Sequence, residues 1–148
     1  MSKNNDIPFE MTLLVRDTCL CLHAQRVARA LARRFDDGLR PVGLTNGQFS
    51  LLMSLNRPGP ASMSSVADVL AMDRTTLTAA LKPLERRGLL SISVDPGDRR
   101  AKLLSLTSAG REVLTRALPI WTETHAAVET LLESGDPDRL RADLRAIS

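Results

Sequence analysis

The sequence predicts a mainly α-helical fold with a small β component (α+β class): a winged helix-turn-helix flanked by long helices at both ends. Two observations favour it. Amphipathic helix patterns follow one another up to residue 87, and the last two are short and are separated only by Met72-Asp73. An alternating apolar segment with a charged turn comes next, which is typical of a β-hairpin. Helix, short helix, turn, helix and hairpin in this order form a helix-turn-helix with a wing.

The composition is that of a globular chain. Its 148 residues fit one domain, 1–148, and 43% hydrophobic residues are enough for a core. Aromatic residues make up only 3%, with one Trp and no Tyr, so the core should be aliphatic. The lack of Tyr also argues against binding of RNA or single strands, which relies on bases stacked on aromatic side chains.

The sequence lacks the signals of membrane or secreted proteins. No apolar run reaches the length of about 18 residues that a membrane helix needs, so no membrane partner is expected. The polar N-terminus also lacks the apolar centre of a signal peptide. We therefore expect a cytoplasmic protein in which Cys19 and Cys21 are reduced thiols.

The first long helix is predicted over residues 11–35. Leu20, Ala24, Val27, Leu31 and Phe35 recur at helical spacing, and the opposite face is rich in arginine. Asp37-Gly38 and Pro41-Val42-Gly43 break this pattern.

Capping residues then mark three shorter helices. Thr45 is a suitable N-cap for a helix over 46–56, and Ser62 or Ser64 for one that ends near Ala71. Asp73 caps a third helix over 74–87, and Gly88 suits the left-handed position behind it. The inward stripe of this third helix is Leu77, Ala80, Leu81 and Leu84. Pro83 removes one backbone hydrogen bond, so we expect a bend there.

The hairpin and the terminal helices complete the chain. Leu90 to Val94 and Leu103 to Leu106 are the predicted strands, joined by the turn Asp95-Pro96-Gly97-Asp98. Thr107 caps a long helix over 108–133, which contains Pro119. Pro137 suits the first turn of a last helix over 138–147.

Positive charge is concentrated where DNA contacts would lie. Residues 73–102 carry seven basic and four acidic side chains, which accounts for the whole net charge of +3. On the helix 74–87, small hydroxyl and basic residues face away from the apolar stripe, which suits a major groove. The candidate DNA-binding residues there are Arg74, Thr75, Thr76, Thr78, Lys82 and Arg86. The alternative is an ordinary solvated helix face.

The predicted wing, residues 95–102, has the charged tip Asp98-Arg99-Arg100. A guanidinium group at a hairpin tip can enter the narrow minor groove, where the potential is most negative. Asp98 can pair with an arginine and stiffen the tip. The alternative is an ordinary charged turn.

The quoted segments resemble the MarR family. Asp95-Pro96-Gly97-Asp98-Arg99-Arg100 with Leu104, Leu106-Thr107 and Gly110 resembles its wing signature. Gly43-Leu44-Thr45 with Gln48-Phe49, and Thr75-Thr76-Leu77-Thr78 with Leu84-Glu85-Arg86-Arg87-Gly88-Leu89, are similar to its helix-turn-helix segments. The resemblance covers roughly residues 11–133.

The resemblance implies a double-stranded DNA-binding regulator with a lobe at 45–106. It further implies homodimerisation through the helices 11–36 and 108–147, and a pseudo-palindromic operator. It also implies repression that a small molecule or an oxidant relieves. Within this pattern, Arg100 would enter the minor groove with Asp98 as its orienting partner, and Thr75, Thr76, Thr78 and Lys82 would face the major groove.

Two kinds of effector are considered. The position of Cys21 resembles that of the sensing thiol in peroxide-responsive family members, but the tyrosines that bind the oxidised sulfur there have no counterpart here. The other kind is an aromatic or other organic molecule, as the resemblance implies. The candidate pocket residues are Arg16, Cys21, His23, Phe49, Met53 and Trp121.

We expect no cofactor, no metal and no catalytic residues. Cys19 and His23 share a helix face, yet two ligands fall short of the four of a structural zinc site. Two other classes stay open as alternatives. One is a thiol peroxidase that uses Cys21, and the other is a dimerisation module whose wing contacts protein.

Overall fold

The computed structural model describes residues 6–148, which divide into two compact units, one up to Arg34 and one from Phe35 onward. The first unit contains helix α1 (Phe9–Thr18) and most of α2 (Leu20–Leu39). None of the helices in the described residues is both long and apolar enough to cross a membrane.

The predicted single helix over 11–35 is wrong, because the chain leaves the helical conformation at Cys19 (φ −70°, ψ 109°). Thr18 precedes the break and its hydroxyl donates to the carbonyl of Leu14. The sulfur of Cys19 accepts a hydrogen bond from the amide of Leu22 at 3.4 Å, so Cys19 caps α2. The apolar positions that predicted one helix, from Leu20 to Phe35, all lie in α2, so they carried no information about residues 11–18. At its other end α2 passes through Gly38, where the pattern predicted a break.

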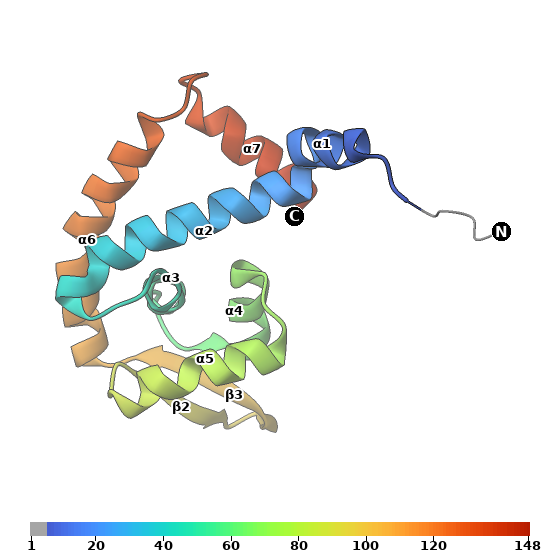
Figure 1. Cartoon of the computed structure of the whole chain (residues 1–148). Coiled ribbons are helices and arrows are strands. Elements are labelled where there is room, and N and C mark those ends of the chain that lie inside the picture. The colour runs from blue at the N-terminus through green and yellow to red at the C-terminus, as the bar shows by residue number, and fades with distance from the viewer. Residues whose placement is uncertain (1–5) are drawn as a thin grey trace. The chain divides into compact units, whose positions relative to one another are not determined.

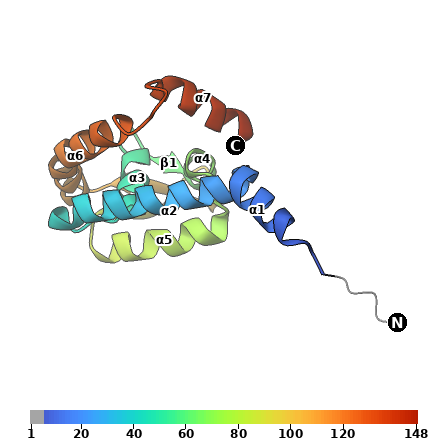
Figure 2. The ribbon, with the colours of Figure 1, turned by 45° about the horizontal axis from the view of Figure 1, so that its top comes forward.

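The second unit is the winged helix-turn-helix followed by two helices (Figure 1). A 3₁₀ turn, η1 (Arg40–Val42), leads into α3 (Asn46–Ser54), strand β1 (Ala61–Ser62) and α4 (Met63–Leu70). Then follow α5 (Arg74–Arg86), β2 (Leu90–Asp95), β3 (Asp98–Leu106), α6 (Ser108–Glu129) and α7 (Pro137–Ile147). Within this unit, α6 and α7 are separated by a turn, as Figure 2 shows. The long helix ends at Glu129, earlier than the predicted residue 133.

The predicted caps are confirmed. Thr45 forms a capping box with Gln48, and the side chains of Ser62, Asp73 and Thr107 each accept a hydrogen bond from the first turn of their helix. Gly88 has the left-handed conformation (φ 70°) behind α5. Pro83 and Pro119 both lie inside helices that continue past them.

The sheet has three antiparallel strands in the order β1-β3-β2. The predicted hairpin β2–β3 is confirmed, with Leu90 opposite Leu106. However, β3 begins at Asp98 and not at the predicted Leu103, so Arg99 and Arg100 lie within the strand. Strand β1 was not predicted, because its two residues are too few to show an alternation; Ala61 pairs with Leu104 and Ser62 with Leu103. This pairing fixes the start of α4 beside the wing.

The core of the second unit is mainly aliphatic, as the composition predicts, and it also contains the buried ring of Phe49. None of its buried residues is polar or charged within the described part of the chain. The largest fully buried side chains are Leu39, Leu51, Leu52, Leu77, Leu81, Leu84, Leu90, Leu104 and Val66. They come from α2, α3, α4, α5 and both strands of the hairpin, so one core joins the recognition helix to the wing.

One junction connects α5, the hairpin and α6. The hydroxyl of Thr107 donates to the carbonyl of Gly88 and accepts from the amide of Gly110 at 3.1 Å. The amide of Thr107 donates to the carbonyl of Leu89 at 3.2 Å. A side chain at Gly110 would overlap the carbonyl oxygen of Leu89, so the close approach of α6 to the start of β2 requires glycine.

We therefore expect Gly110→Ala to destabilise the protein by about 3 kcal/mol, because the overlap is with backbone that cannot move freely. Urea unfolding followed by circular dichroism measures this loss. Gly47→Ala is the matched control, since Gly47 lies in helix α3 with open space around the added carbon. That change should stabilise by roughly 0.5–1 kcal/mol. Equal effects of the two substitutions would contradict the role given to Gly110.

Candidate nucleic-acid interface

Helix α5 is held by its cap and its apolar stripe. Asp73 Oδ1 accepts from the amide of Thr76 at 2.7 Å, and Oδ2 accepts from the hydroxyl of Thr76 at 2.9 Å. These bonds hold the pKa of the Asp73 carboxyl below its usual range. Leu77, Leu81 and Leu84 are buried and Ala80 is half-buried, which confirms the predicted inward stripe.

The other face of α5 is open to solvent. All six candidate residues on this helix, namely Arg74, Thr75, Thr76, Thr78, Lys82 and Arg86, are exposed. The hydroxyl of Thr78 donates to the carbonyl of Arg74 at 2.8 Å, and that of Thr76 donates to its cap. Thr75 differs, since no side-chain hydrogen bond of its hydroxyl is found among the described residues. Its hydroxyl remains able both to donate to and to accept from a base edge.

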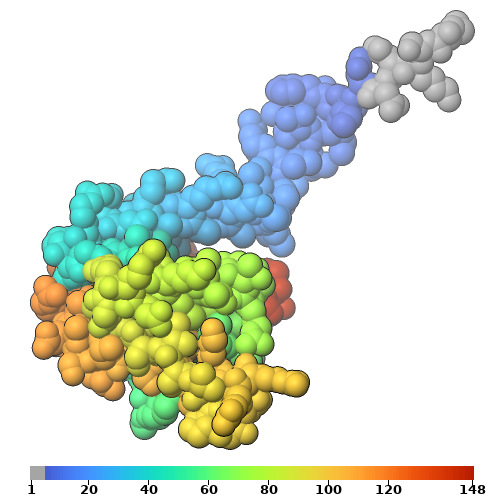
Figure 3. Space-filling view, turned by 90° about the horizontal axis from the view of Figure 1, so that it is seen from below, coloured from blue at the N-terminus to red at the C-terminus, as the bar shows by residue number. Residues whose placement is uncertain are grey.

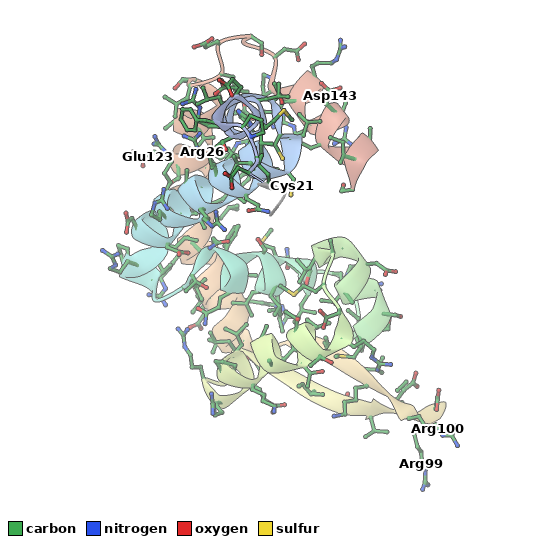
Figure 4. The ribbon with its side chains drawn as sticks, turned by 45° about the vertical axis from the view of Figure 1, so that its right-hand side comes forward. Cys21, Arg26, Arg99, Arg100, Glu123 and Asp143 are labelled. Carbon is green, nitrogen blue, oxygen red and sulfur yellow. The ribbon has the colours of Figure 1, made fainter. Side chains whose placement is uncertain are left out.

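The wing tip projects from the unit as a basic arm. Figure 3 shows the hairpin standing out beyond the surface of α5, and in Figure 4 Arg99 and Arg100 point away from the body. Both arginines are exposed and neither has an ion pair within the described part of the chain. Their guanidinium groups are therefore available to a phosphate backbone or a minor groove.

The side chains of Asp95 and Asp98 accept hydrogen bonds from the backbone of the turn and form no ion pair with Arg99 or Arg100 in residues 6–148. Asp95 Oδ1 accepts from the amide of Gly97 at 2.9 Å, and Asp98 Oδ1 accepts from the amide of Arg100 at 3.0 Å. The sequence suggested a pair between Asp98 and an arginine side chain. The structure instead shows Asp98 holding the backbone of Arg100.

A hollow of about 230 Å³ lies between the start of α4, the start of α5 and the wing. We call it the wing hollow. Its lining is Ser62, Met63, Ser64, Arg74, Asp98, Arg100, Ala101 and Lys102. Three cations and two hydroxyl groups surround one carboxylate, so the lining favours an anion. Sequence analysis did not identify Ser62, Ser64 and Lys102 as site residues. The two-residue strand β1, which brings Ser62 and Ser64 beside Lys102, is too short to show an alternating sequence pattern.

Arg87 has a structural role instead. Its guanidinium donates to the carbonyl of Gly43 at 2.9 Å, which ties the end of α5 to η1. At the start of α3, Asp36 Oδ1 accepts from the amide and the side chain of Asn46 at 2.7 and 2.8 Å. These bonds lower the pKa of the Asp36 carboxyl.

The candidate effector residues fall into both units. In the second unit, Phe49 stacks on Trp121 with ring centroids 6.3 Å apart, and Trp121 stacks on His125 at 4.8 Å. Phe49, Met53 and Trp121 line a hollow of about 460 Å³, the aromatic hollow. Its other lining residues are Ser50, Ser54, Val69, Leu70 and Leu118.

Arg16, Cys21 and His23 belong to the first unit. Arg16 pairs with Asp17 at 2.7 Å, and Gln25 Nε2 donates to the sulfur of Cys21 at 3.2 Å. His23 Nδ1 lies 2.8 Å from the carbonyl oxygen of Cys19. Cys21 is exposed on α2, as Figure 4 shows. Residues 6–148 contain no group of three His, Cys, Asp or Glu side chains placed to hold a metal ion.

This fold and this surface define a winged helix-turn-helix protein of the class that regulates transcription. Residues 44–102 match the model of the MarR family. The structure is similar to that of the M. tuberculosis transcriptional regulator MosR in complex with DNA, with a TM-score of 0.81 and 36% identity. The similarity covers 88% of this chain and 93% of that one. The chain belongs to the MarR family.

Two further relatives bear on regulation. The transcriptional repressor NicR of Pseudomonas putida is 36% identical over 51% of this chain and 48% of its own length. The chain thus spans about half the length of such curated relatives. BpsR of Bordetella bronchiseptica, whose DNA binding is regulated by 6-hydroxynicotinic acid, is 26% identical with a TM-score of 0.77. That match covers 86% of this chain and 91% of BpsR.

The lowered pKa of Asp73 predicts an acid-sensitive recognition helix. A carboxylate whose pKa is lowered on folding stabilises the fold above its unfolded pKa, and this stability is lost as the pH falls through the folded value. Urea midpoints measured between pH 7 and pH 3 should therefore fall less steeply for Asp73→Asn than for the original chain. The asparagine keeps a capping oxygen, so folding at pH 7 is preserved. If the urea midpoint depends on pH in the same way in Asp73→Asn and in the original chain, the role given to the Asp73 carboxylate is contradicted.

Proposed function

We propose that this protein is a sequence-specific double-stranded DNA-binding transcriptional regulator. The observation that carries the proposal is the arrangement of α5 and the wing, which present an exposed polar helix face and a basic tip on either side of the wing hollow. In this arrangement α5 enters the major groove and the wing enters the adjacent minor groove. Such a protein acts where the genome is, so we place it in the cytoplasm.

The geometry divides the contacting residues into three groups. Arg74 and Lys102 line the wing hollow together with Ser64, which suits a backbone phosphate held between helix and wing. Thr75, Thr76, Thr78, Lys82 and Arg86 face outward along α5 and are proposed to lie over base edges. Arg100, fixed through its backbone by Asp98, is proposed as the minor-groove residue, with Arg99 beside it.

We further propose that the protein works as a homodimer on a pseudo-palindromic operator. Apolar side chains are exposed on both terminal helices, including Phe9, Leu14 and Val15 on α1 and Leu144 and Ile147 on α7. Exposed apolar stripes of this kind need a partner surface. The helices 11–36 and 108–147 are therefore the proposed dimerisation elements around one lobe, 45–106, of a single domain.

An organic effector and a repressor role complete the proposal. The regulation of BpsR by 6-hydroxynicotinic acid and the repressor NicR support it by family likeness. In this chain the aromatic hollow is the favoured effector site, because it holds the stacked rings of Phe49 and Trp121.

DNA binding is tested with operator fragments selected from genomic DNA and then measured by fluorescence anisotropy. We expect Lys82→Ala and Arg100→Ala each to weaken binding by about 10-fold, since each removes a charged contact. Affinity should also fall steeply with salt, and the slope should be shallower in both variants.

Arg139→Ala is the matched control, because Arg139 is exposed on α7 and its one ion pair within residues 6–148 is with Asp143. It should leave the affinity unchanged. A salt-independent interaction, or equal losses in all three variants, would overturn the proposed interface.

Dimerisation is tested by Leu144→Glu, which places a charge in the exposed apolar stripe of α7. We expect sedimentation equilibrium at micromolar concentration to give a dimer for the original chain and a monomer for this variant. Asp143→Ala, at the neighbouring exposed position, should stay dimeric. A monomeric original chain would refute dimerisation through these helices.

A further inference from the structure

Three threonines on the exposed side of α5 differ in what their hydroxyl protons do. The hydroxyl of Thr78 donates to the carbonyl of Arg74, one turn earlier, at 2.8 Å. The hydroxyl of Thr76 donates to Asp73 Oδ2 at 2.9 Å. Thr75 alone among them has no side-chain hydrogen bond within residues 6–148. A hydroxyl whose proton is already donated can only accept a further bond, so the three side chains are not equivalent on this surface.

The direction of the Thr76 bond is fixed by Asp73. Asp73 Oδ1 accepts from the backbone amide of Thr76 at 2.7 Å, while Oδ2 accepts from its hydroxyl. These bonds hold the pKa of the Asp73 carboxyl below its usual range, so at neutral pH both of its oxygens are acceptors only. The proton between the two side chains must therefore belong to Thr76.

The oxygen of Thr76 is then left with lone pairs alone for a ligand. Such an oxygen repels other acceptors, including the oxygens of a phosphate, and matches an N–H donor. In the major groove of DNA the donors are the exocyclic amino groups of adenine and cytosine, which we call the amino bases. Guanine and thymine, the keto bases, carry acceptor oxygens instead. Each base pair contains one base of each class, so an acceptor-only group distinguishes the two strands of a pair.

The place of Thr76 on α5 suits contact with a base. It lies in the first turn of α5, the part of a recognition helix that contacts base edges. Its side chain is exposed, about 100° around the helix from the buried Leu77. Lys82 and Arg86, in later turns, can only donate and match the acceptors of guanine. The exposed face of α5 therefore offers an acceptor near its start and donors further along.

From this arrangement we propose that Thr76 recognises the class of one operator base. Its hydroxyl oxygen accepts a hydrogen bond from an amino base and discriminates against a keto base at the same position. Asp73 is a positioning residue, because it acts through Thr76 by fixing the direction of the hydroxyl. This inference deepens the proposed function and rests on it, since it requires α5 in the major groove.

The side chain at position 73 should control the discrimination, and two substitutions that can still cap α5 change it in different ways. In Asp73→Asn the backbone amide of Thr76 still needs an oxygen, so the NH₂ group takes the place of Oδ2 and donates to the Thr76 hydroxyl. The hydroxyl proton then points outward. In Asp73→Ser the single oxygen serves the backbone amide, which leaves the Thr76 hydroxyl free both to donate and to accept.

The experiment measures duplex binding by fluorescence anisotropy for every single-base-pair substitution of the operator selected from genomic DNA. Thr76→Val keeps the size of the side chain and its methyl contact but removes the hydroxyl, so it identifies the base pair that Thr76 contacts. At that pair the original chain should bind a duplex with the amino base at least about 5-fold more tightly than one with the keto base on the same strand. Thr76→Ser should keep this ratio of affinities.

We expect the ratio to reverse in Asp73→Asn and to fall to about one in Asp73→Ser. Loss of a negative charge beside DNA raises the affinity for all duplexes alike, so the ratio is the readout that a merely electrostatic or structural role would not change. Glu85→Gln is the matched control. It removes the same charge from an exposed position of α5, and Glu85 has no ion pair within residues 6–148. It should leave the ratio unchanged.

A base analogue tests the same contact in the original chain, without reliance on the folding of a variant at position 73. Replacing the contacted adenine by purine, or the contacted cytosine by pyrimidin-2-one, removes only the amino group. The original chain should lose about 5-fold in affinity for such a duplex, whereas Thr76→Val should bind both duplexes equally.

The proposal is overturned if Thr76→Val changes the preference at no base pair, if Asp73→Asn still favours the amino base, or if the analogue binds as tightly as the natural base. These results are distinct from a failure of the proposed function. An original chain that binds all duplexes equally contradicts sequence-specific DNA binding itself. Sequence-specific binding with a ratio that no substitution at position 73 alters contradicts only the roles of Thr76 and Asp73.

Discussion

The hydroxyl of Thr107 links three parts that must hold a fixed relation for the proposed DNA contacts. It donates to the carbonyl of Gly88 behind α5 and accepts from Gly110 in the first turn of α6. The left-handed Gly88 turns the chain from the recognition helix into β2, and the bare Gly110 lets α6 approach the carbonyl of Leu89. Because the hydrogen bonds of Thr107 hold the end of α5 and the end of β3 together, the recognition helix and the wing can present a single surface to two adjacent grooves of DNA.

The chain contains only three Phe, one Trp and no Tyr, and two of these aromatic residues, Phe49 and Trp121, stack on each other. The core is built mainly from leucine and valine, whose side chains carry no polar atoms that need a hydrogen-bond partner. The backbone amides at the starts of the helices are capped by the side chains of Thr45, Ser62, Asp73 and Thr107. Phe49 belongs to this core and stacks on Trp121, which packs against the core beside the aromatic hollow. Because Trp121 is only half-buried, the boundary between α3 and α6 is where this core opens onto the aromatic hollow.

Most of the second unit could be predicted from sequence because its signals are local. A capping side chain acts within three residues, and the strands of the hairpin are adjacent along the chain. The break at Cys19 was not predicted, because the apolar positions that indicated the helix, from Leu20 to Phe35, all lie in α2. Strand β1 and the wing hollow depend on a pairing across about forty residues, from Ala61 to Leu104. For the same reason sequence analysis identified Arg100 but missed Lys102 and Ser64.

The position of the aromatic hollow constrains how an effector could act. A bound molecule shifts DNA affinity only if it binds the DNA-competent and incompetent conformations unequally. The stacked rings of Phe49 and Trp121 lie 6.3 Å apart at their centroids, so a flat ring inserted between them would have to spread α3 from α6. Since α3 packs on α4 and the Thr107 junction holds α5 and the wing, a change in the spacing of α3 and α6 alters the position of the helix-turn-helix relative to the wing.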